Sequence, residues 1–136
     1  MTVAALLLAG GRGTRAGGGI PKQYREIGGI SVLRRAIDCF IDCPAVDLIR
    51  VVIHADDQAL YRAATAGLDI LLPVIGGTER HLSAVNGLES LSDFETDIVL
   101  IHDAARPFAD RGMIERVIAA LADAAGAIPA LPVSDT

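Results

Sequence analysis

The sequence predicts an α/β protein with a doubly wound, mainly parallel β-sheet and helices on both sheet faces, giving three layers. Short apolar runs alternate along the chain with longer segments in which apolar residues recur at helical spacing. The first run, residues 3–8 (VAALLL), lacks polar residues at alternate positions, as expected for a strand buried on both faces. Strands that alternate with helices in this way form right-handed βαβ units.

The other expected strands are further apolar runs. They cover residues 48–54 (LIRVVIH), 69–74, 97–102 (DIVLIH) and 127–133 (AIPALPV). Helices are expected between them, at residues 31–41, 56–66, 79–91 and 110–122. Ser31 is a suitable N-cap for the first helix. The first helix would bury a stripe of Val32, Leu33, Ala36, Ile37 and Phe40, and the third would have Leu82, Val85 and Leu88 roughly on one side.

The composition excludes several classes of protein. A chain of 136 residues suggests one domain, and 51% hydrophobic residues suffice for a sizeable core. No uncharged apolar run approaches the roughly 18 residues of a membrane span, and the N-terminus indicates a strand and not a signal peptide. The net charge of −5 argues against a nucleic-acid binder, whereas the positive charge within residues 12–25 suits a small anionic ligand.

The only two cysteines, Cys39 and Cys43, are spaced to lie on one face of a helix. Two ligands cannot complete a structural zinc site, which needs four. We therefore expect two buried thiols in a cytosolic protein.

A glycine-rich loop with positive charge follows the first strand. Its sequence over residues 9–22 is AGGRGTRAGGGIPK. Glycines let backbone N–H groups approach an anion closely and form a concave nest for phosphate oxygens. Arg15 and Lys22 would add charge-assisted hydrogen bonds, and Pro21 would stiffen the chain before Lys22. A long turn with solvated charges is the alternative.

Two other phosphate-binding loops fit this segment poorly. A Walker A lysine follows glycine and precedes Ser or Thr, whereas Lys22 follows a proline and precedes a glutamine. Gly11, Gly13 and Ala16 formally match the dinucleotide fingerprint. That fingerprint opens a helix at once, whereas this loop continues to Pro21, so a dinucleotide oxidoreductase is a minor alternative.

Other unusual segments are expected beside this loop. Residues 9–24, 76–80 and 102–107 each follow a predicted strand, although they lie far apart in the sequence. In doubly wound sheets ligands bind beyond the carboxyl ends of the strands. We therefore expect these segments to form one ligand site.

The motifs in these segments resemble one enzyme family. The loop pattern L-A-G-G-x-G-x-R followed by P-K is similar to nucleotidyltransferases that activate sugars and alcohols. It continues with PKQY at 21–24, GGTER at 76–80, Ser83, NGL at 86–88, HDAARPF at 102–108 and PVSDT at 132–136. Together, and in this order, they resemble the 2-C-methyl-D-erythritol 4-phosphate cytidylyltransferase (IspD) family of the non-mevalonate isoprenoid pathway over nearly the whole chain.

This resemblance implies a Rossmann-like nucleotidyltransferase fold and a definite reaction. A cytidylyl group would pass from CTP to 2-C-methyl-D-erythritol 4-phosphate, with release of pyrophosphate. The implied cofactor is Mg²⁺. The implied enzyme is cytoplasmic, forms a homodimer at full length, and has neither nucleic acid nor membrane as a partner.

The resemblance also implies roles for individual residues. Arg15 and Lys22 match catalytic residues that stabilise the transition state, and Thr136 matches a substrate-binding position. Asp103 would lie near the ribose and the Mg²⁺ ion, which prefers hard oxygen ligands. The nucleotide would be bound by Ala9, Gly10, Gly11, Gly13, Ser83, Asp103, Ala104, Ala105 and Arg106.

Structural roles remain open for several of these residues. Asp103 could cap a turn and pair with Arg106, and Ser83 could serve only its helix. We expect His102 to pack or bond locally.

The sequence departs from the family at some positions. Gly10 stands where alanine is common, which keeps the related ribitol-phosphate cytidylyltransferases open, and Thr78 replaces a frequently acidic residue. Family members continue well past Thr136. We therefore expect a fragment in which residues 1–136 form a single domain, the N-terminal CTP-binding portion. A non-catalytic nucleotide-binding module and a transferase with another base or acceptor are the alternatives.

Overall fold

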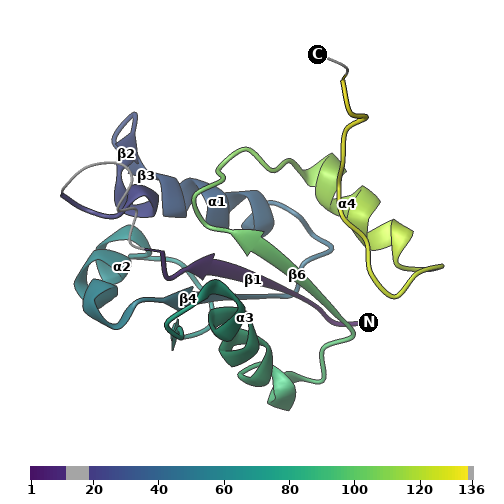
Figure 1. Ribbon diagram of the computed structural model, residues 1–136, viewed down its shortest axis with the longest axis horizontal. Helices are drawn as coiled ribbons and strands as arrows, with labels where there is room; N and C mark the ends of the chain where they lie inside the picture. The colour runs from purple at the N-terminus through teal and green to yellow at the C-terminus, as the bar shows by residue number, and fades with distance from the viewer. Residues whose placement is uncertain (12–18, 135–136) are drawn as a thin grey trace.

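The computed structural model of the chain describes residues 1–11 and 19–134 (Figure 1). Its main sheet has the order β5-β4-β1-β6, and every neighbouring pair of strands is parallel. The strands are β1 (Val3–Ala9), β4 (Leu48–Ile53), β5 (Val74–Ile75) and β6 (Ile98–Asp103). β1 is buried over its whole length because it has a paired strand on each side and an apolar core on each of its two faces. The expected mainly parallel α/β sheet is confirmed.

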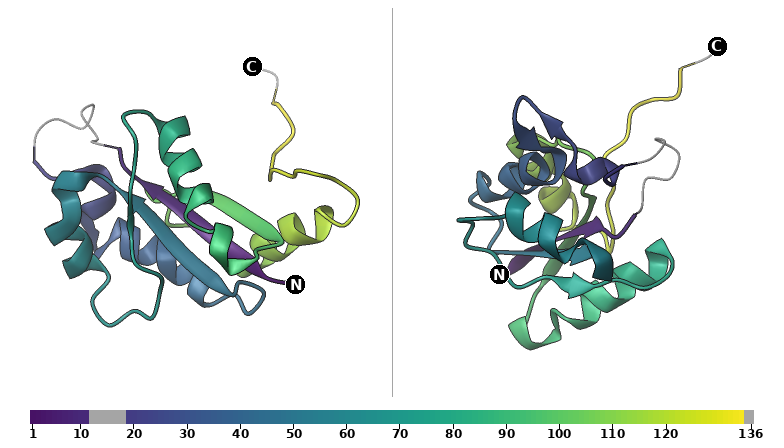
Figure 2. Two further views of the ribbon diagram at one scale, coloured as in Figure 1. Left: turned by 90° about the horizontal axis from the view of Figure 1, so that it is seen from below. Right: turned by 90° about the vertical axis from the view of Figure 1, so that its left-hand side faces the viewer.

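Helices cover both faces of this sheet, as Figure 2 shows most clearly in its left view. The helices are α1 (Val32–Ile41), α2 (Gln58–Ala64), α3 (Arg80–Glu89) and α4 (Arg111–Ala120). Short 3₁₀ turns are η2 (Lys22–Tyr24), η3 (Ala55–Asp57) and η4 (Ser92–Phe94), and a small hairpin joins β2 (Glu26–Ile27) to β3 (Ile30–Ser31). No helix in the described part of the chain has the length and apolar character needed to cross a membrane.

Two apolar cores lie on the two faces of β1. Val3, Ala5 and Leu7 pack in a core with residues of α1, α2 and α4. Ala4 and Leu6 belong to a smaller core on the face that α3 covers. This arrangement follows from the alternation of side chains along a strand, and it explains why the first apolar run contains no polar residue.

Helix α1 forms as the sequence predicts. Ser31 is its N-cap, and the Ser31 hydroxyl accepts a hydrogen bond from the Arg34 backbone N–H at 3.1 Å. The buried residues of α1 are Val32, Leu33, Ala36, Ile37 and Phe40, which is the predicted stripe. Burying one large apolar side chain contributes about 1.5–3 kcal/mol, so this stripe fixes the helix on the sheet.

Two of the predicted strands differ in the structure: one is much shorter than expected and the other does not form. Within residues 69–74 only Val74 is in a strand, because β5 begins there and pairs over two residues with β4. Residues 127–133 form no strand, and Leu131 is 89% exposed. The prolines at 129 and 132 have no N–H to donate to a sheet ladder, and an apolar run alone does not supply a partner strand.

The third helix does not pack on the sheet through the apolar side that the sequence predicts. Leu82, Val85 and Leu88 are all exposed, whereas Ser83 and Gly87 are buried. A Cβ atom on Gly87 would lie 2.7 Å from both terminal methyl carbons of Leu6. Helix α3 therefore approaches the sheet through small residues, which a search for apolar stripes does not detect.

Candidate functional site

The carboxyl ends of three neighbouring strands meet at one edge of the sheet, which we call the rim. The register pairs Ala9 with Ile53 and Leu8 with Asp103, so β1, β4 and β6 end at the same level. The arrowheads of β1 and β6 accordingly point to the same side in Figure 1. The backbone N–H of Ala104 donates to the carbonyl of Leu8 at 3.0 Å, which joins the segment after β6 to the end of β1.

Ser83 connects two glycine segments of the rim. Its hydroxyl accepts a hydrogen bond from the backbone N–H of Gly77 at 3.2 Å. A Cβ atom on Gly10 would lie 3.5 Å from the Ser83 hydroxyl oxygen, and one on Gly76 would lie only 2.5 Å from it. The turn after β5, the start of α3 and the segment after β1 therefore come together, as the sequence predicts.

Gln23 contacts the start of the glycine-rich loop at the rim, and the sequence reasoning did not single it out. It is 4% exposed, and its side-chain nitrogen Nε2 donates to the carbonyl oxygens of Ala9 at 2.9 Å and Gly11 at 2.8 Å. The PKQY motif at residues 21–24 contains Gln23, but the motif does not indicate which groups the glutamine side chain would contact. The amide ties the η2 turn to the beginning of the glycine-rich loop.

Of the two predicted catalytic residues, the structure describes only Lys22. Lys22 is exposed and opens η2, next to the anchored Gln23. The backbone N–H of Arg25 donates to the Lys22 carbonyl at 3.2 Å, which closes this turn. Arg15 lies outside the described residues, as do the predicted nucleotide-binding Gly13 and the predicted substrate-binding Thr136.

Asp103 and Arg106 form a local turn at the end of β6. One Asp103 carboxylate oxygen accepts from the Ala105 backbone N–H at 3.0 Å, and the other lies 3.7 Å from the Arg106 Nε. The side chains are 42% and 78% exposed, respectively. This exposure leaves the Asp103 carboxylate accessible to a ligand, and an exposed ion pair of this kind contributes only about 0–1 kcal/mol.

His102 bonds locally, as expected. Its Nε2 lies 2.8 Å from the Arg106 carbonyl oxygen, and its ring meets the Phe40 ring edge-on with centroids 5.1 Å apart. These two contacts give the His102 ring a local structural role.

Of the two cysteines, Cys39 lies in helix α1 and Cys43 follows its end. Both are free thiols; Cys43 is buried and Cys39 is half-buried. The Cys39 thiol donates to the carbonyl oxygens of Arg35 and Pro107. Burial raises the pKa of Cys39 above its ordinary value, which disfavours the reactive thiolate.

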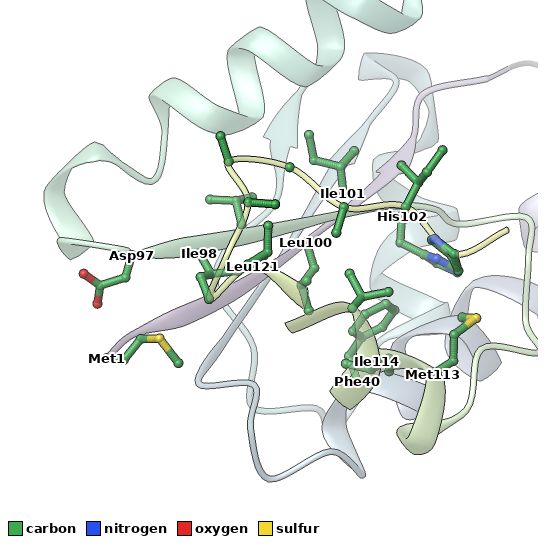
Figure 3. Close-up of a pocket in the computed structure, with 18 residues that line it drawn as sticks. Met1, Phe40, Asp97, Ile98, Leu100, Ile101, His102, Met113, Ile114 and Leu121 are labelled. Atoms are coloured by element: carbon green, nitrogen blue, oxygen red, sulfur yellow. The ribbon is translucent and has the colours of Figure 1, made fainter. Parts of the chain in front are cut away.

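A cavity of about 740 Å³ lies between β6, α4 and residues 124–129 (Figure 3). Its wall is mostly apolar, with Leu100, Ile114 and Leu121 among the side chains that Figure 3 labels. The described residues that line it include the Asp97 carboxylate but no Lys or Arg side chain that could bind a phosphate. Among the described residues, no group of three or more His, Cys, Asp and Glu side chains is arranged to hold a metal ion.

The fold is that of the nucleotidyltransferase class. A solved 4-diphosphocytidyl-2C-methyl-D-erythritol synthase superposes with a TM-score of 0.82 at 34% identity, over 98% of this chain and 61% of the other. A second, from Anaerococcus prevotii, gives 0.76 at 32% identity, over 90% of this chain and 51% of the other.

Within this class, the chain belongs to the IspD family. The family model, described as 2-C-methyl-D-erythritol 4-phosphate cytidylyltransferase, matches residues 3–136. A bifunctional enzyme IspD/IspF from Rhodospirillum rubrum is 55% identical over 98% of this chain, and one from Paramagnetospirillum magneticum is 51% identical over 96%. The chain spans only 35% and 34% of the length of these two relatives.

Proposed function

We propose that residues 1–136 form a single domain, the N-terminal CTP-binding portion of a cytidylyltransferase. The enzyme transfers a cytidylyl group from CTP to 2-C-methyl-D-erythritol 4-phosphate and releases pyrophosphate. Membership of the IspD family supports the reaction. The observation that carries the proposal is the meeting of the glycine segments at Gly10 and Gly77 around Ser83, beside the end of β6.

The chemistry makes limited demands on side chains. An oxygen of the acceptor phosphate forms a bond to the α-phosphorus of CTP, and the bond from that phosphorus to the β-phosphate oxygen breaks. The electron pair leaves with pyrophosphate. The protein must align the two phosphates and neutralise their charge. Backbone N–H groups at Gly10 and Gly11 would bind phosphate or base, and Arg15 and Lys22 would supply the positive charge.

The residues present fit a Mg²⁺ ion. Mg²⁺ is usually held by one or two carboxylates together with substrate phosphates and waters. Asp103 offers a partly exposed carboxylate at the rim, where the phosphates would lie. When bound, the ion would withdraw charge from the phosphate oxygens. Ala104, Ala105 and Arg106 would line the same side of the nucleotide.

The remaining partners are proposed on the family resemblance. They are a sugar-alcohol phosphate as acceptor, bound in part by Thr136, and a second copy of the full-length protein in a homodimer. A cytoplasmic location stays a prediction, as does the absence of nucleic acid and membrane partners.

A pyrophosphate-release assay tests this function on the complete protein that contains the chain. We expect pyrophosphate to form with CTP, Mg²⁺ and 2-C-methyl-D-erythritol 4-phosphate together, and not when ATP replaces CTP. Release with ribitol 5-phosphate alone would favour the related cytidylyltransferases. CTP binding without any release, across a panel of acceptors, would instead support a non-catalytic nucleotide-binding module.

A further inference from the structure

We propose that Gln23 is a positioning residue of the nucleotide site, because its amide fixes the orientation of the peptide that carries the Gly10 N–H. The inference rests on the proposed function, since it assigns Gln23 to the binding of the CTP phosphates or base. Gln23 acts through the backbone and is not itself placed on the reacting atoms.

The first support is the geometry of the amide. A glutamine Nε2 carries two hydrogens, and both find acceptors here, the carbonyl oxygens of Ala9 and Gly11. These two carbonyls flank Gly10, so one side chain controls the backbone on either side of it. Because Gln23 is buried, water does not compete for these hydrogen bonds.

The second support is the planarity of the peptide. No cis peptide bond occurs in the described residues, so the Ala9 carbonyl and the Gly10 N–H point in opposite directions from one plane. Holding the Ala9 carbonyl toward Gln23 therefore directs the Gly10 N–H away from Gln23. An N–H fixed in this way needs no reorganisation when an anion binds, which is the basis of preorganised recognition.

The third support is the set of neighbours. Gly10 also lies against Ser83 of α3, and Gln23 follows Lys22 within the η2 turn. The anchored amide thus fixes the start of the loop relative to the backbone of Lys22. A Cβ at position 10 would make ordinary van der Waals contact with the Ser83 hydroxyl oxygen at 3.5 Å, so Gly10 lies directly beside Ser83.

A purely structural role makes a different prediction. If Gln23 only filled space and satisfied two carbonyls, its loss would lower stability and leave nucleotide affinity unchanged in the folded protein. If it positions the Gly10 N–H, the loss must appear in the KM for CTP and not in the KM for the acceptor phosphate.

The test compares Gln23→Met and Gln23→Glu in the complete protein that contains this chain. Methionine is close to glutamine in size but donates no hydrogen bond, and glutamate would face two carbonyl oxygens with a carboxylate. We expect the KM for CTP to rise about tenfold or more in both variants, with the KM for the acceptor within about twofold. Ile37→Val, a core change in α1, is the control for a loss of stability without a change in KM.

A second measurement does not depend on how the variants fold. In the ¹⁵N-labelled wild-type protein, CTP should shift the Gly10 amide resonance more than the resonances of α4. An unshifted Gly10 resonance under saturating CTP, or a normal KM for CTP in folded Gln23→Met, would overturn the positioning role while CTP turnover by the wild type stands. A folded wild type that neither binds nor turns over CTP would overturn the proposed function, and this inference with it.

Discussion

The Ser83 hydroxyl accepts a hydrogen bond from the Gly77 backbone N–H at 3.2 Å. This contact joins the first turn of α3 to the segment that follows β5. Because Ser83 also lies against Gly10, one buried hydroxyl sets the spacing between two glycine segments of the rim.

Ser83→Ala should weaken nucleotide binding more than it weakens the fold. Loss of one hydrogen bond costs about 1 kcal/mol, so we expect the KM for CTP to rise about fivefold. Steady-state kinetics of the complete protein measures this. Ser92→Ala, in the exposed η4 turn, is the matched control and should leave the KM unchanged. A KM for CTP in Ser83→Ala equal to that of the wild type would remove Ser83 from the site.

Gly87→Ala should destabilise the protein although alanine favours helix formation. The new Cβ would lie 2.7 Å from Leu6 methyl carbons and 2.9 Å from a methyl carbon of Val52, so α3 must move away from the sheet. We expect a loss of about 1–3 kcal/mol in the free energy of unfolding, measured by urea denaturation. Gly112→Ala in α4 is the control, because a Cβ there would lie no closer than 3.3 Å to its nearest neighbours, and we expect it to change the free energy of unfolding by less than about 1 kcal/mol.

Lys22→Ala should lower turnover far more than stability. An interaction with phosphate made in the transition state is worth on the order of 3 kcal/mol, which corresponds to roughly a hundredfold in kcat. The melting temperature should barely change, because Lys22 is exposed. Arg116→Ala, on the exposed side of α4, should keep full turnover. Unchanged kcat in folded Lys22→Ala would contradict its assignment.

Asp103→Asn separates a metal ligand from a turn residue. Asparagine keeps an oxygen that can accept from the Ala105 N–H, but it loses the charge that attracts Mg²⁺. We expect the Mg²⁺ concentration for half-maximal turnover to rise about tenfold, with little change in melting temperature. The same titration of Asp93→Asn, in the exposed η4 turn, should match the wild type. If Asp103→Asn needs the same Mg²⁺ concentration as the wild type, Asp103 is a turn residue and not a metal ligand.

Cys39 should make stability fall at alkaline pH. Burial raises the pKa of this thiol, so the folded protein favours the neutral form relative to the unfolded chain. The resulting stabilisation is fully present below the ordinary thiol pKa of about 8.5 and is lost as pH rises through the raised value. Urea denaturation between about pH 8 and 9.5 should show a smaller fall for Cys39→Ala than for the wild type. Tyr61, whose pKa burial also raises, ionises only at higher pH. Equal slopes would refute the role of Cys39.

Much of the fold could be predicted from the sequence because burial leaves a periodic pattern. The unbroken apolar run of β1 and the stripe of α1 follow directly from a strand covered on both faces and a helix covered on one. The same reasoning failed for residues 127–133, where apolar composition resembles a strand but prolines interrupt the ladder. It also failed for α3, which packs through Ser83 and Gly87, since small residues carry little apolar signal.

The site was predictable only where topology or family resemblance fixes it. The βαβ alternation brings the ends of β1, β4 and β6 to one edge, so the grouping of Gly10, Ser83 and Asp103 could be expected. The contacts of Gln23 could not be found in this way, because its side chain folds back onto the carbonyls of Ala9 and Gly11 in the preceding segment. No local sequence pattern predicts these hydrogen bonds.

Calorimetric titration of this chain with CTP and with ATP, each in the presence of Mg²⁺, tests the central claim most directly. The account predicts saturable binding of CTP at one site per chain and much weaker binding of ATP. Heat from neither nucleotide, in a chain shown to be folded by circular dichroism, would contradict the claim that residues 1–136 form a nucleotide site.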